Sequence, residues 1–147
     1  MKQNLVILFG AFLMMVGCRD PYVQVPIAAT ATVAQNWTEV RPAEPLRWTK
    51  PVQEFSFHID TPHQRSTQVE IVGPGGEHFI PEVELVTVSG KTIVMDGHGF
   101  WGEEMCFDWS KGAAGMEPIQ AIRIRSRVPL QISNLIWRGY DPAEVKR

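Results

Sequence analysis

Short runs in which apolar and polar residues alternate most strongly limit what this chain can fold into. In Val52–Ile59, aromatic or aliphatic side chains occupy every second position from Phe55 to Ile59, and polar side chains lie between them. A period of two places successive side chains on opposite faces of a β-strand. Similar runs follow at 68–72, 82–88, 91–96, 104–109, 119–126 and 130–137. With about seven short strands and no stripe of helical period, residues 51–142 predict an all-β domain, an antiparallel two-sheet β-sandwich.

Turn-forming residues separate these runs and indicate how they connect. Residues 73–76 read Gly-Pro-Gly-Gly, which is a strong turn signal. Ser89 and Gly90 are predicted to join two runs in a hairpin, and residues 127–129 are predicted to join the last two runs in a closing hairpin. Helix is expected only as a turn near residues 110–114, and residues 143–147 are predicted to be a C-terminal tail.

Residues 1–17 have the three parts of a secretory signal peptide. Lys2 supplies a charge, residues 5–16 form an unbroken apolar run, and Gly17 is a small residue before Cys18. A helix that crosses a bilayer needs about 20 apolar residues, so this run is too short for a permanent span. We therefore expect a signal that is removed from the mature protein.

The four residues Met15–Cys18 resemble the lipobox of bacterial lipoproteins, with apolar and small residues before an obligatory cysteine. The resemblance implies that Cys18 receives a diacylglyceryl group and becomes the first residue after cleavage, anchored in a membrane of the bacterial cell envelope. Each buried methylene of such a lipid contributes about 0.8 kcal/mol to anchoring. The alternative is an ordinary secretory signal that contains a cysteine. Arg19 and Asp20 leave open whether the inner or the outer membrane holds the anchor.

Residues 18–50 differ in composition from the rest of the chain. Prolines punctuate small residues such as those at 28–32, and such a composition resists compact packing. We predict an acylated N-terminus followed by a proline-rich tether. The later part of this segment contains Trp37 and Trp48, which are costly to leave in water, so it is expected to lie along the edge of the domain.

The final predicted strands, "IQAIRIRSRVPLQISNLIW", are similar to the last strands of galactose-binding-like jelly rolls. That sandwich is used by many carbohydrate-binding modules. The similarity lies in alternation around a central proline and covers about 20 residues. It implies a jelly-roll-like fold, while function has to be argued from a site.

No motif of a known catalytic or cofactor site is present. The chain lacks a nucleophile elbow, a zinc-binding His-Glu-x-x-His and a phosphate-binding glycine loop. Cys106 is flanked at alternate positions by Glu104 and Asp108, which would raise its pKa rather than activate it, so a small packed residue is expected. With a formal charge of −2, the chain lacks the excess of basic residues that indicates nucleic-acid binding. We expect a non-enzyme without cofactor or metal.

Residues 95–104 are the most unusual stretch, because three glycines accompany charged and aromatic residues. We predict a loop that places an aromatic ring beside hydrogen-bonding groups, as sugar binding requires; its candidate ligand-binding residues are Asp96, His98, Trp101 and Glu103. Carboxylates in such a loop could equally hold a hard cation. A third possibility is a long turn in which Phe100 and Trp101 cap the core.

Arg123, Arg125 and Arg127 recur at every second position and are predicted to share one strand face. Such a row is a candidate face for an anion or an acidic partner. The alternative is a solvated face whose arginines pair across strands with Glu82, Glu84 or Asp108.

The five tryptophans divide into two groups. Trp109 and Trp137 fit core positions, whereas Trp37, Trp48 and Trp101 are candidates for exposed platforms. Together these features favour an anchored, non-catalytic module that binds a glycan or an envelope partner. The alternative is a structural lipoprotein that docks into an envelope protein complex, and an enzyme is the least favoured class.

Overall fold

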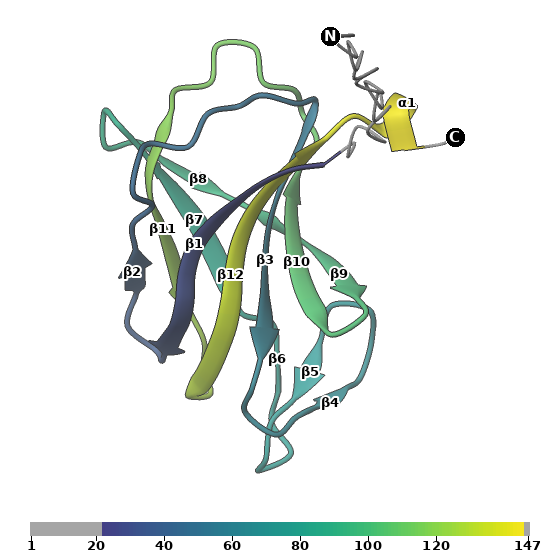
Figure 1. Ribbon diagram of the computed structural model, residues 1–147. Helices are drawn as coiled ribbons and strands as arrows, with labels where there is room; N and C mark the ends of the chain where they lie inside the picture. The colour runs from purple at the N-terminus through teal and green to yellow at the C-terminus, as the bar shows by residue number, and fades with distance from the viewer. Residues whose placement is uncertain (1–21, 146–147) are drawn as a thin grey trace, which may run out of the picture.

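The domain is a sandwich of antiparallel sheets, seen in a computed structural model that describes residues 22–145. One sheet has five strands in the order β1 (Tyr22–Val33), β12 (Leu130–Tyr140), β3 (Val52–Ile59), β10 (Glu104–Trp109) and β9 (Asp96–Trp101). The other has four, in the order β2 (Thr38–Val40), β11 (Ile119–Arg125), β7 (Glu82–Thr87) and β8 (Thr92–Val94). Figure 1 shows the two layers facing each other. This confirms the predicted all-β sandwich.

The core lies between the two layers and is built from the apolar half of each alternating strand. The five-stranded sheet contributes Phe55, Phe57 and Phe107, and the rings of Phe57 and Phe107 stack with centroids 5.8 Å apart. The four-stranded sheet contributes Leu85 and Ile122, which are fully buried. Burial of each such side chain contributes about 1.5–3 kcal/mol to stability. The alternating pattern stabilises the fold because it places these side chains on the face of each strand that is buried.

Several predicted elements are confirmed. Strands β3 and β10 have the bounds that alternation indicated, and β7 and β8 form the predicted hairpin. Gly90, with φ of +86°, lies in its turn, where its N–H donates to the carbonyl oxygen of Thr87 at 2.9 Å. A glycine adopts this left-handed backbone without a steric penalty, which explains the turn signal.

The tether predicted after residue 18 is wrong for residues 22–33, which form the longest strand among the described residues. Strand β1 pairs with β12 from Tyr22 opposite Tyr140 to Val33 opposite Leu130, and the two run side by side in Figure 1. Pro26 fits because β1 is an edge strand and the pairing shifts register between Pro26 and Ala28. The domain therefore includes residues 22–33 and does not begin at residue 51.

The predicted closing hairpin is also wrong, because its two strands belong to different sheets. Residues 127–129 carry the chain from β11 in one layer to β12 in the other. Alternation identifies both strands correctly, but it is a local pattern and does not say which neighbours a strand pairs with.

Four further elements complete the fold among the described residues. The run at 68–72 forms only the short β5 (Ile71–Val72), which pairs with β4 (Gln64–Arg65) and β6 (His78–Phe79) in a small sheet. No helix forms at residues 110–114. The single helix of the described chain is α1 (Pro142–Val145), within the segment that was predicted to be a tail.

Candidate functional site

The outer face of the five-stranded sheet, which points away from the core, carries a cluster of buried charges. Glu54 lies on this face of β3 and is only 2% exposed, and its neighbour Ser56 is fully buried. A buried carboxylate is costly unless it is paired and hydrogen-bonded. The alternation that sends Phe55 and Phe57 inward therefore also sends charged groups outward into a second, polar cluster.

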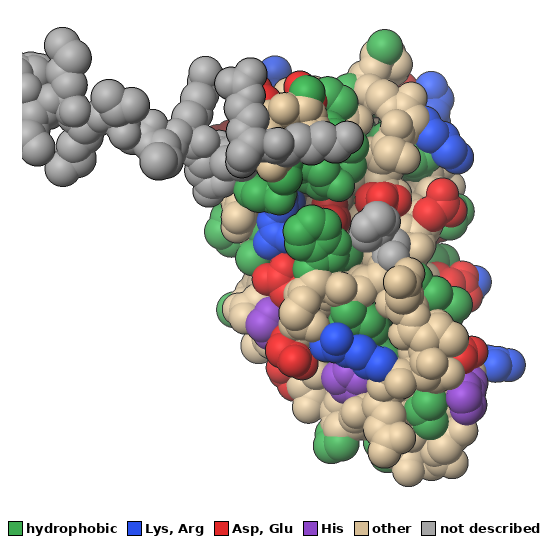
Figure 2. Space-filling view, turned by 90° about the vertical axis from the view of Figure 1, so that its right-hand side faces the viewer, with side chains coloured by type: hydrophobic (Ala, Val, Ile, Leu, Met, Phe, Trp, Pro, Cys, Tyr) green, Lys and Arg blue, Asp and Glu red, His purple; other side chains and the backbone are tan. Residues whose placement is uncertain are grey.

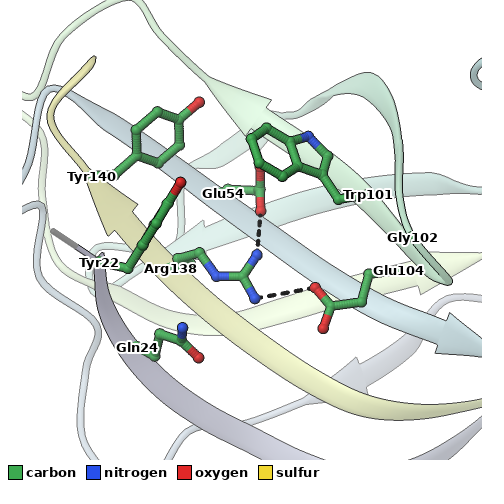
Figure 3. Close-up of a pocket in the computed structure, with 8 residues that line it drawn as sticks. All are labelled: Tyr22, Gln24, Glu54, Trp101, Gly102, Glu104, Arg138 and Tyr140. Atoms are coloured by element: carbon green, nitrogen blue, oxygen red, sulfur yellow. Dashed lines mark hydrogen bonds and ion pairs between the residues drawn. The ribbon is translucent and has the colours of Figure 1, made fainter. Parts of the chain in front are cut away.

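Arg138 of β12 joins two carboxylates from neighbouring strands (Figure 3). Its Nη1 donates to Oε1 of Glu54 at 2.9 Å, and its Nη2 donates to Oε2 of Glu104 at 3.1 Å. The register sets this geometry, because Arg138 lies directly opposite Glu54. Glu104 also accepts a 3.3 Å hydrogen bond from Ser56 and lies 3.6 Å from Nε2 of His58. We call Glu54, Glu104, Arg138, Ser56 and His58 the charge network.

The electrostatics of this face follow from burial and from the two carboxylates. Burial alone would lower the pKa of Arg138, but the hydrogen bond and charge of Glu104, together with the charge of Glu54, raise it. Burial, followed by the charges of Glu54 and Glu104, raises the pKa of the Cys106 thiol to about 12. The guanidinium stays charged, and Cys106 is the protonated, packed residue that the sequence predicted.

Three aromatic side chains stand around the charge network and enclose a pocket of about 400 Å³. Tyr22 and Tyr140 lie side by side with ring centroids 5.5 Å apart, and the indole of Trp101 stands across from them in Figure 3. Gln24 lines the same pocket. Burial raises the pKa of Tyr140, and the charge of Glu54 adds to this effect. Figure 2 looks onto the side of the molecule where β9 and β10 lie and where hydrophobic and charged side chains adjoin at the surface. We call the pocket that Tyr22, Tyr140 and Trp101 form around the charge network the aromatic pocket.

The predicted loop at residues 95–104 is wrong, because these residues form strand β9 and a tight turn into β10. Trp101 reaches the aromatic pocket and is 48% exposed, as the platform prediction required. Glu103 instead points into solvent at the turn and pairs with Arg65 at 3.4 Å. Asp96 lies at the other end of β9, opposite Asp108. The backbone of His98 lies in β9, and its side chain is outside the described part of the structure.

Glycine in β9 serves close packing rather than a flexible loop. Gly99 has φ of +137°, and a Cβ atom there would lie 3.0 Å from the carbonyl oxygen of Gln68. Only glycine adopts this backbone readily and lets the neighbouring chain approach so closely. The glycine at position 99 is therefore explained by an edge strand that packs closely against Gln68.

Of the predicted arginine face, Arg123 and Arg125 lie on β11 and are paired, whereas Arg127 lies beyond the end of that strand. Arg123 contacts Glu39 at 3.0 Å and Glu84 at 3.3 Å. Arg125 contacts Glu82 at 2.7 Å. These are the cross-strand pairs with Glu82 and Glu84 that the alternative predicted, so the charge of this face is largely balanced.

Asp108 and Arg127, the other residues of the arginine prediction, lie apart from these ion pairs. Asp108 does not join the row, because it lies in the other sheet. Arg127 follows β11 in the connection to β12 and is exposed. Arg125 additionally lies over the ring of Trp37 at 4.5 Å, so this exposed tryptophan supports an arginine. This face is chiefly a network of surface ion pairs.

Trp48 is not an exposed platform, contrary to the prediction. Its ring packs edge-on against Trp137 at 5.5 Å and against Trp109 at 6.1 Å. Its Nε1 donates to the carbonyl oxygen of Glu117 at 2.8 Å. Trp137 is buried as predicted, and Trp109 is half-buried beside the core. The segment before β3 thus closes one end of the sandwich.

Metal and membrane features were sought within residues 22–145. No group of three or more His, Cys, Asp or Glu side chains in this part could hold a metal ion. None of its helices has the length and hydropathy needed to cross a membrane. Cys18, the predicted lipidation site, lies outside the described residues.

Most residues of the aromatic pocket were not predicted from the sequence. Glu54, Glu104 and Arg138 read as ordinary polar positions of alternating strands, and Tyr22 and Tyr140 lie at strand ends. The available signal was a charge within each of two apolar strands, Glu54 in β3 and Arg138 in β12, but only the register brings these charges together.

Comparisons with protein-family models, with curated proteins and with solved structures found no match. Function is therefore argued from the chemistry of the site.

Proposed function

We propose that this chain is a lipid-anchored, non-catalytic binding protein of the bacterial cell envelope whose aromatic pocket binds a sugar. The observation that carries the proposal is the combination of three aromatic faces with a fixed carboxylate–guanidinium network in one pocket of about 400 Å³. A sugar ring has an apolar C–H face and a rim of hydroxyl groups. Tyr22, Tyr140 or Trp101 can stack on the face, while Glu54, Glu104 and Arg138 can bond the rim.

Preorganisation supports this role. Glu54, Glu104 and Arg138 are each held on a strand and by hydrogen bonds to one another, so little conformational entropy of these side chains is lost on binding. Hydrogen bonds to charged groups contribute about 1.5–3 kcal/mol each. A few such bonds with one stacking contact are enough for a selective glycan site.

The same network supports a non-catalytic role. A glycoside hydrolase uses two carboxyl groups, one of them kept protonated to act as the acid. Here Glu54 and Glu104 both accept a hydrogen bond from the guanidinium of Arg138, so both carboxyl groups are engaged as acceptors within the charge network. Cys106 is protonated and buried, so it does not supply a thiolate nucleophile.

The sugar-binding proposal is tested on a glycan array with the chain produced from Arg19 onward, without the signal segment and Cys18. We expect binding to a small set of sugars, and we expect Trp101→Ala to weaken it at least about tenfold, equivalent to 1.4 kcal/mol. Trp37→Ala is the matched control, because Trp37 is an exposed tryptophan of the other layer that supports Arg125. Full binding by Trp101→Ala would exclude this pocket, and an array without any bound sugar would contradict the proposal.

The anchor is tested separately by Cys18→Ser in a bacterial host. The variant should incorporate no labelled fatty acid and should remain as the uncleaved precursor. Normal processing of the variant would instead identify an ordinary secretory signal.

A structural role in an envelope complex is the second candidate, and one surface favours it. Val23 and Val25 are exposed on the edge strand β1, beside a pocket of about 360 Å³ formed with residues 43–47. Edge strands with apolar side chains are sites where another chain can add. Crosslinking from position 23 in cells should then capture an envelope protein, and a purely monomeric profile would count against this role.

A further inference from the structure

The aromatic pocket begins very close to the predicted lipid anchor. Tyr22 is the first residue of β1 and lines the pocket, and only three residues separate it from Cys18. An extended chain spans at most about 3.6 Å per residue, so the Cα atoms of Cys18 and Tyr22 are at most about 14 Å apart. A tether of some thirty residues, which the composition suggested, would have placed no such limit.

The Tyr22 side of the pocket also lies at the end of the sandwich nearest the anchor, whereas Glu104, opposite His58, and Trp101, opposite Glu104, lie farther along the sheet. Tyr22 pairs with Tyr140, and Gln24 with Arg138, at the first positions of the β1–β12 ladder. From there β12 runs back through 11 residues, which at about 3.3 Å each is roughly 36 Å. The end at Leu130 could therefore extend far from a membrane, whereas the Tyr22 side of the pocket could not.

The side chains of the pocket suit the surface of a membrane. Tyrosine and tryptophan are enriched where lipid meets water, because each combines an apolar ring with a polar group. Tyr22, Tyr140 and Trp101 are rings of this kind around a polar floor. A ligand in the same membrane would also meet the pocket at high effective concentration.

We propose that the aromatic pocket binds the sugar headgroup of a glycolipid in the membrane that holds the anchor. The inference rests on the proposed sugar binding and on acylation of Cys18, and it adds the source of the sugar. Polar headgroup layers are only several ångströms thick, so a headgroup lies within the reach that the short connection leaves to the pocket. A soluble or polymeric glycan would require no such confinement.

The test compares two acylated proteins in phosphatidylcholine vesicles. One is the native mature chain, and the other carries about ten prolines inserted after Asp20, which extend as a stiff spacer by roughly 31 Å. The probe is a photoreactive neoglycolipid bearing the sugar that the glycan array selects. Intact mass confirms acylation of both proteins, and binding of the soluble sugar is measured for each.

We expect both proteins to bind the soluble sugar equally, because the spacer lies outside the sandwich. The native chain should crosslink to the neoglycolipid at least about tenfold more than the spacer variant, and Trp101→Ala should reduce this signal to background. Equal crosslinking by native and spacer proteins would overturn the membrane source while sugar binding stands. Failure of both proteins to bind soluble sugar would remove the proposed function itself, and the inference with it.

Discussion

Replacing Arg138 by methionine should destabilise the domain by about 3–5 kcal/mol, the usual cost of leaving buried charges without their partner. The guanidinium is 13% exposed and lies between Glu54, which is 2% exposed, and Glu104, which is 22% exposed. Methionine keeps most of the volume, so the loss reports on charge rather than on a cavity.

Urea unfolding followed by circular dichroism measures this loss at neutral pH. Adding Glu54→Gln to Arg138→Met should recover about half of the loss, since one unpaired charge is removed. Arg125→Met is the matched control, because its partner Glu82 is exposed, and it should cost under about 1 kcal/mol. A loss as small as that of the control, or no recovery in the double variant, would refute the reasoning by showing that water reaches the carboxylates.

Three further predictions concern single side chains. Cys106, with its pKa raised to about 12, should resist iodoacetamide at about pH 8 in the folded protein and react on unfolding; labelling of the native state would contradict its burial. The hydrogen bond from Arg123 is the main reason why the pKa of Glu39 is lowered. The ionised carboxylate therefore stabilises the fold at pH values above its ordinary pKa of 4.5, and this stabilisation is lost as the pH falls. Glu39→Gln should therefore melt below wild type at neutral pH, and the two melting curves should converge in acid. Trp48→Ala should cost about 3 kcal/mol in urea unfolding, because the ring packs against Trp109; a loss near zero would mean that this end of the sandwich is open.

The strands could be predicted from the sequence because alternation is a local property. Phe55 and Phe57 report the period of β3 whatever lies beside it. The layer to which β11 and β12 belong depends on distant pairing, and so the hairpin between them was predicted wrongly. Residues 22–33 were misjudged because proline and alanine disfavour isolated strands, while pairing with a long neighbour outweighs that preference.

Of the candidate site, the sequence identified only Trp101. An exposed tryptophan beside glycines is visible without a fold, whereas the pairing of Arg138 with Glu54 requires the register between β12 and β3. Buried charge networks are hard to predict for this reason, because each member has an ordinary polar position in its own strand. The arginine row was the more conspicuous pattern, and it formed ion pairs with neighbouring glutamates.

The pairing of β1 with β12 also sets the order in which the protein can fold. The first described strand finds its partner only near the end of the chain, so the five-stranded sheet cannot close until nearly all residues have been synthesised. Contacts this distant in sequence form slowly. A chain exported from the cell would therefore reach the translocation machinery without its finished sheet, and folding would be completed on the far side of the membrane.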